Sequence, residues 1–275
     1  MGKRCLAILI SLCMVLWLAP EAAEAKESER VYVALGDSIS AGYGLPDGED
    51  PFTKQIADNN HYTFYSLAES GETSASLLEK LSDPTVMQTL AKADIITITI
   101  GGNDLMGGLY EYLANVYNQD KKPSVLFTAT DMQNAIVVKK EWDKLLFALE
   151  KIVGFDGSEE VTASINDFIV NFNSVIQKIQ AENPEAIIVV TNQYNPYQYA
   201  AEQSTMEEAE ILMEAFENGV EALNDAIVNL SSQTGFAVAD VYSVFRDAEE
   251  NPCNASFSSL FNIELDFHPN AYGHS

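Results

Sequence analysis

The pattern of apolar and polar positions along the chain predicts strands that alternate with helices. Short apolar runs predict five strands, at residues 31–35, 62–67, 94–100, 186–192 and 236–241. The run "DIITITI" at 94–100 has β-branched residues on both faces, which is typical of a strand in the middle of a parallel sheet. Apolar residues that recur at steps of three and four predict helices at residues 75–92, 139–153, 161–179 and 212–230.

The order of these elements indicates the fold class. Strands that alternate with helices form a parallel sheet covered on both faces. We therefore expect an α/β, flavodoxin-like three-layer sandwich with a central five-stranded parallel sheet in the order 2-1-3-4-5. Thr205 and Glu208 predict a capping box where the last helix starts. Residues 105–157 are long for one crossover and predict a helical insertion after the third strand, either a lid over the site or packing.

The first 25 residues have the three-part pattern of a secretory signal peptide. Lys3 and Arg4 precede the apolar stretch "CLAILISLCMVLWLAP", and "AEA" at 23–25 supplies small residues for cleavage. We therefore expect residues 1–25 to be a signal peptide and residues 26–275 to form the domain. The protein would be secreted or held at the cell surface, with no stable membrane insertion after cleavage.

Composition and charge narrow the classes of protein. The chain has 275 residues, of which 47% are hydrophobic, and this is enough for a large core. The formal net charge of −26 repels phosphate backbones, so nucleic acid is not expected as a partner. Outside the leader the only cysteine is Cys253, and no cysteines or histidines have metal-ligand spacing, so we expect no disulfide, metal or cofactor. For the leader, an uncleaved anchor and a lipoprotein anchored at Cys13 remain alternatives.

Three polar motifs follow the first three predicted strands. They are "GDSIS" at 36–40, "SGETS" at 70–74 and "GGND" at 101–104. In an open parallel sheet, ligands bind beyond the carboxyl ends of the strands, and the expected strand order makes these three loops neighbours. Each loop supplies a group that acyl transfer needs: Ser38 a hydroxyl, Gly71 a backbone N–H, and Asn103 a side-chain amide. Donors from Gly71 and Asn103 that point at one position would form an oxyanion hole.

A serine nucleophile needs a base, and the chain has three histidines. His61 precedes the second strand, at the wrong edge of the sheet. His274 would lie inside a following helix. His268 comes after the fifth strand, at the correct edge, so we expect His268 to be the base, with Asp266 or Glu264 orienting its other ring nitrogen.

Four motifs together resemble the SGNH, or GDSL, hydrolase superfamily of esterases and lipases. They are "GDS" at 36–38, Gly71, "GGND" at 101–104 and "DFHPN" at 266–270, in the family's order. The stretches "GDSISAGYGL" and "TNQYNPY" look like the secreted bacterial branch. The resemblance implies Ser38 as nucleophile and His268 as base, with oxyanion donors from Ser38 N–H, Gly71 N–H and Asn103. The G-x-S-x-G elbow of other lipases is absent from the sequence.

The chain departs from the family pattern at the acid. That pattern puts an acid three residues before the histidine, where this chain has Leu265, and Asp266 lies two before. Asp266, Glu264 or a backbone carbonyl therefore remain alternatives for the partner of His268. The family pattern also continues through a closing helix after "AYGH", so C-terminal truncation is one interpretation of the end at Ser275.

These patterns predict a secreted serine esterase or lipase that hydrolyses carboxylic esters through an acyl-enzyme on Ser38. The substrate would be a small-molecule, glycan or lipid ester, and its acyl length, its alcohol and the oligomeric state of the protein stay open. The alternative function is a non-catalytic module on the same fold that binds carbohydrate or a surface. The aromatic segment "NQYNPYQY" predicts either the wall of a pocket or a packed loop.

Overall fold

The computed structural model describes residues 29–259 and 262–275, so the predicted signal peptide at residues 1–25 lies outside the described residues. Five strands form one parallel sheet in the order β2-β1-β3-β4-β5, which confirms the predicted topology. The strands are β1 (Val31–Gly36), β2 (Thr63–Ser66), β3 (Ile95–Thr99), β4 (Ile187–Thr191) and β5 (Ala237–Ala239).

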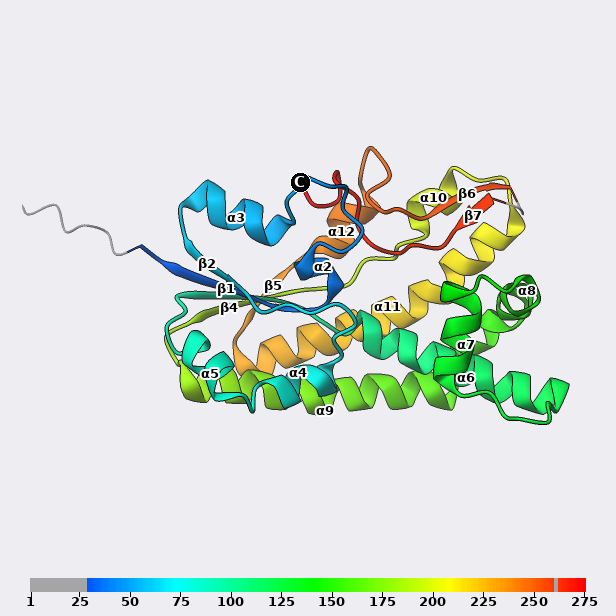
Figure 1. Ribbon diagram of the computed structural model, residues 1–275, viewed down its shortest axis with the longest axis horizontal. Coiled ribbons are helices and arrows are strands. Elements are labelled where there is room, and N and C mark those ends of the chain that lie inside the picture. The colour runs from blue at the N-terminus through cyan, green and yellow to red at the C-terminus, as the bar shows by residue number, and fades with distance from the viewer. Residues whose placement is uncertain (1–28, 260–261) are drawn as a thin grey trace, which may run out of the picture.

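Helices cover both faces of this sheet, as predicted (Figure 1). Side chains alternate along β1: Val33 and Leu35 pack under the first layer of helices, whereas Tyr32 and Ala34 face the opposite layer. The first layer consists of α4 (Ser74–Lys80), α5 (Pro84–Leu90), α9 (Glu159–Glu182) and α11 (Glu207–Thr234). The opposite face of β1 packs against α3 (Phe52–Asn60). The remaining helices outside the insertion are α2 (Ser38–Ala41), α10 (Gln198–Glu202) and α12 (Val241–Arg246).

The predicted helical insertion lies beyond the carboxyl ends of the strands (Figure 1). It comprises α6 (Gly102–Lys121), α7 (Ala129–Gln133), the π-helical turn η1 (Asn134–Val138), α8 (Trp142–Lys151) and the 3₁₀ turn η2 (Ile152–Phe155). Its buried side chains join those of α11 and of the chain's last segment in a second core, separate from the core under the sheet. The insertion thus builds a wall at the edge of the sheet where ligands bind.

Near the C-terminus, β6 (Ser256–Ser259) and β7 (Asn262–Glu264) pair as an antiparallel hairpin that the apolar pattern did not predict. The hairpin leads directly into the segment that carries the candidate base. Among residues 29–259 and 262–275, no helix has both the length and the apolar content of a membrane span.

Some predicted boundaries are wrong. The helix expected at 75–92 is two helices, because Pro84 disfavours helical backbone at Asp83, whose side chain caps α5. The capping box at Thr205 and Glu208 does not form, since the chain is still extended at Met206 and α11 starts at the next residue. The last strand ends at Ala239 rather than at 241, because the residues after it start α12.

Candidate active site

Ser38 is held in place by the close approach of β1 to β3. Gly36 has φ of 109°, and a Cβ atom there would lie 2.0 Å from the carbonyl oxygen of Thr99, so only glycine fits. The carboxylate of Asp37 accepts hydrogen bonds from Ile39 N (3.0 Å) and from Thr99 Oγ1 (2.8 Å). Burial raises the pKa of Asp37 to about 6, although the Thr99 hydrogen bond lowers it. These contacts set Ser38 as the first residue of α2 at the carboxyl edge of the sheet.

Ser38, His268 and Asp266 form a chain of hydrogen bonds. Ser38 Oγ lies 2.9 Å from His268 Nε2, and His268 Nδ1 lies 2.6 Å from Asp266 Oδ1. Because Nδ1–H donates to the carboxylate, Nε2 is left to accept the Ser38 hydroxyl proton. The Ser38 residue is 5% exposed and His268 8% exposed, so water is largely excluded from their contact.

Of the alternatives for the partner of His268, Asp266 is the one in contact. Its Oδ1 also accepts the backbone N–H of His268 (3.1 Å), and its Oδ2 accepts from Asn254 Nδ2 (3.1 Å). Burial raises the pKa of Asp266, but the hydrogen bonds from His268 outweigh it and leave the pKa below its usual value. Glu264 pairs instead with Lys140, at 3.4 Å. The acid that contacts His268 is therefore Asp266, one residue after the position that the family pattern gives.

The segment around His268 is held from several sides. Tyr194 OH donates to the carbonyl of Phe267 (3.0 Å), and Tyr197 OH donates to that of Leu265 (3.2 Å). The aromatic segment is therefore packed and also supports the site, since Tyr197 lines the cavity described below. Neither these tyrosines nor Asn254 were predicted to support the base, because no sequence motif links them to His268.

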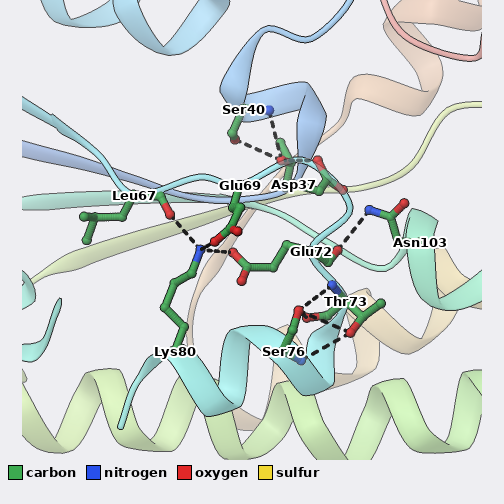
Figure 2. Close-up of polar contacts among 10 residues, drawn as sticks. Asp37, Ser40, Leu67, Glu69, Glu72, Thr73, Ser76, Lys80 and Asn103 are labelled. Carbon is green, nitrogen blue, oxygen red and sulfur yellow. Dashed lines mark hydrogen bonds and ion pairs between the residues drawn. The ribbon is translucent and has the colours of Figure 1, made fainter. Parts of the chain in front are cut away.

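The predicted oxyanion donors lie beside Ser38. Gly71 has φ of 84°, and the space where a Cβ would sit is empty, so its backbone borders open space. Asn103, in the first turn of α6, donates from Nδ2 to the carbonyl of Glu72 (2.9 Å), as Figure 2 shows. Since Ser38, Gly71 and Asn103 all line one cavity, the expectation that the three loops are neighbours is confirmed.

The other two histidines lie outside this group. His61 ends α3 at the amino edge of β2, as expected. His274 is buried, accepts a hydrogen bond from Phe52 N (3.3 Å) at Nδ1, and has a pKa lowered to about 4 by burial. It lies in a turn that Asn270 caps through Gly273 N (3.1 Å). Within the described ranges, no three or more His, Cys, Asp or Glu side chains gather as metal ligands.

A cavity of about 510 Å³ opens beside Ser38 and His268. Its size lies in the range of ligand-binding pockets, and most of its wall is apolar. The apolar wall comes from α6, α8 and α11 and the two turns that flank α8, and it includes Leu109, Leu113, Ile136, Leu145, Ala148, Leu149, Ile152, Leu212 and Phe216. The insertion is therefore the main wall of the cavity rather than packing remote from the site.

A protein-family model, described as the GDSL-like Lipase/Acylhydrolase family, matches residues 34–275. Together with the five-stranded parallel sheet, this match defines a carboxylic ester hydrolase with the SGNH hydrolase fold. The chain belongs to the GDSL-like lipase/acylhydrolase family.

Individual relatives are distant. The chain is 25% identical over 284 residues to the uncharacterized protein YpmR of Bacillus subtilis, covering 98% of this chain and 89% of that protein. It is 23% identical over 225 residues to the spore germination lipase LipC of Bacillus licheniformis, covering 80% and 83%. The structure of an extracellular lipase from Streptomyces rimosus matches with a TM-score of 0.57 at 20% identity, covering 90% and 95%, and this likeness shows the fold alone.

Proposed function

We propose that this protein is a secreted serine esterase or lipase with Ser38 as nucleophile, His268 as general base and Asp266 as the acid that orients the histidine. The observation that carries this proposal is the hydrogen-bonded chain from Ser38 Oγ through His268 to Asp266, with distances of 2.9 and 2.6 Å. This is the arrangement that activates a serine in acyl transfer. A hydrogen-bonded chain of this kind does not favour the alternative of a non-catalytic binding module.

The proposed mechanism uses this geometry. His268 Nε2 takes the proton of Ser38 as Oγ attacks the ester carbonyl, and the Asp266 carboxylate stabilises the imidazolium that forms. The backbone N–H groups of Ser38 and Gly71, with the amide of Asn103, stabilise the negative oxygen of the tetrahedral intermediate. His268 then protonates the leaving alcohol, and a water molecule activated by the same histidine releases the acid from Ser38.

For the acyl part of the substrate we propose a fatty chain rather than an acetyl group. An acetyl group would leave most of a 510 Å³ apolar cavity unfilled, whereas each methylene that enters it is stabilised by about 0.8 kcal/mol. The name of the spore germination lipase LipC among the relatives supports the same substrate class.

Hydrolysis rates across p-nitrophenyl esters of rising chain length test the acyl preference. We expect kcat/KM to rise by roughly threefold to fourfold per methylene from acetyl toward octanoyl, as the chain fills the cavity. Ala148→Trp should remove this rise but leave acetyl ester hydrolysis within about twofold, because Ala148 lines the cavity and the added bulk enters it. The matched control is Leu146→Trp, which adds the same bulk on the exposed side of α8, the helix that carries Ala148. A flat profile in the wild-type enzyme would contradict the fatty-acyl proposal.

Replacing Asn103 by alanine tests the oxyanion hole. We expect kcat to fall by about a hundredfold or more, because one such donor contributes roughly 3 kcal/mol to the transition state. The variant should still fold, and circular dichroism checks this. Asn115→Ala, on the same helix and bonded at the surface to Glu160, is the control. Undiminished turnover of the Asn103 variant would remove this residue from the mechanism.

Secretion is proposed on the leader pattern of residues 1–25. Residues 26–275 would then be the mature hydrolase domain. Mass spectrometry of protein recovered outside the expressing cell should show Lys26 as the first residue. Recovery of all the protein in the cell with the leader still attached would contradict the proposal.

A further inference from the structure

The loop that joins β2 to α4 is tied together by one lysine. Lys80 Nζ, at the end of α4, lies 2.6 Å from Glu72 Oε2, 3.0 Å from the carbonyl oxygen of Leu67 and 3.3 Å from Glu69 Oε2. Figure 2 shows the ammonium group in the middle of these three acceptors. The ammonium group therefore links Leu67, the first residue after β2, to Glu69 and Glu72, which flank the Ser70–Gly71 turn.

This ion pair is not an ordinary surface contact. The side chain of Glu72 is 3% exposed and that of Lys80 is 16% exposed. A buried carboxylate is strongly unfavourable unless a cation and hydrogen bonds compensate it. Burial raises the pKa of Glu72, and Lys80 offsets part of that rise. Lys80 is therefore the cation that compensates the buried carboxylate of Glu72.

The same loop carries one of the proposed oxyanion donors and holds the side chain of another. Gly71 immediately precedes Glu72, and the carbonyl of Glu72 is the acceptor that holds Asn103 Nδ2 at 2.9 Å. The loop is also pinned to the nucleophile's strand, since Glu69 N donates to the carbonyl of Gly36 (2.8 Å). The residue that Lys80 anchors is thus covalently next to one donor and hydrogen-bonded to the other.

We propose that Lys80 is a positioning residue for the oxyanion hole: by holding Glu72 it sets the direction of the Gly71 N–H and of the Asn103 amide. The inference rests on the proposed function of Ser38, Gly71 and Asn103. Without Lys80, the Glu72 carboxylate turns toward water and its backbone carbonyl turns with it. Donors displaced by a fraction of an ångström stabilise the transition state less, while the acyl chain still binds in the cavity.

Lys80→Met, which keeps the apolar stem and removes the charge, is the first test. We expect kcat to fall by about tenfold to a hundredfold with KM within about twofold, because oxyanion contacts form only in the transition state. Lys80→Arg should restore most of kcat. Lys54→Met is the matched control, since Lys54 pairs with Asp58 on α3, outside the site, and it should leave kcat unchanged.

A second variant covers the case in which Lys80→Met does not fold. Lys80→Met combined with Glu72→Gln leaves no unpaired buried charge, so it should fold and still lose kcat by at least about tenfold. A kcat equal to that of the Lys54→Met control in this double variant overturns the inference.

Coupling to Asn103 separates positioning from a general loss of stability. If Lys80 acts through the donors, Lys80→Met should lower kcat by less than about threefold in an Asn103→Ala background, because one donor that it positions is already gone. Losses that multiply fully would overturn the inference.

An NMR readout makes this outcome independent of activity. In ¹⁵N spectra, the Gly71 amide and the Asn103 side-chain amide should shift in Lys80→Met and stay in place in Lys54→Met. Unchanged signals overturn the positioning role. A wild-type protein that hydrolyses no ester and whose Ser38 no fluorophosphonate labels would instead overturn the proposed function, while the NMR shifts still decide the role of Lys80.

Discussion

Replacing Ser38 by alanine is expected to lower kcat for ester hydrolysis by at least about 10⁴-fold, the loss typical of a triad nucleophile. The alanine variant keeps the cavity and the oxyanion donors but has no oxygen to form the acyl-enzyme. Ser38 is small and its loop is held by Asp37 and Gly36, so the variant should fold as the wild type does.

Two measurements check this result. A fluorophosphonate probe should transfer its phosphonyl group to Ser38 of the wild type, with fluoride as the leaving group, and leave the alanine variant unlabelled. His268→Ala should lose about as much kcat as Ser38→Ala, and the double variant little more than either, because the two side chains act as one unit. Wild-type protein that is folded, full-length and unlabelled would support the non-catalytic binding module instead.

The second large effect is expected at Asp266. Asp266→Asn should lower kcat by roughly 10³-fold to 10⁴-fold, because an amide no longer holds the Nδ1–H tautomer of His268 or stabilises the imidazolium. The hydrogen bonds that lower the pKa of Asp266 keep it a carboxylate at neutral pH, so the substitution removes a full charge beside the ring.

The matched control is Glu264→Gln, which also removes one negative charge from the same segment. Glu264 is bonded to Lys140 and its side chain is 47% exposed, so kcat should change by less than about threefold. Steady-state kinetics of the two variants at one pH compares them directly. A large loss in Glu264→Gln with little loss in Asp266→Asn would assign the acid to the other carboxylate.

The strands and their order could be predicted from sequence because a buried parallel strand must be apolar on both faces. The boundaries of the helices were less predictable, because a single residue can end one helix and start another inside a continuous apolar pattern. Pro84 divides a periodic apolar stretch that would otherwise predict one helix. The hairpin of β6 and β7 gave no apolar signal, since its strands are short and carry polar residues such as Ser256 and Asn262.

The candidate site also contains some residues that the sequence predicts and others that it does not. Ser38, Gly71 and Asn103 were predictable because each follows a strand, and parallel strands bring their carboxyl ends to one edge. The choice of histidine followed from the same rule. By contrast, Lys80 belongs to no sequence motif. Its importance to the loop comes from its ion pair with Glu72, which forms only when α4 packs beside the loop.

By itself the sequence determined the fold class, the three neighbouring loops and the identity of the candidate nucleophile and base, since these follow from apolar periodicity and the order of motifs. The tertiary structure alone decided that Asp266 rather than Glu264 meets His268, that the insertion walls an apolar cavity, and that Asn254 and Tyr194 support the base. Those contacts depend on distances of about 3 Å between atoms far apart in the chain, and only the folded packing of the side chains sets such distances.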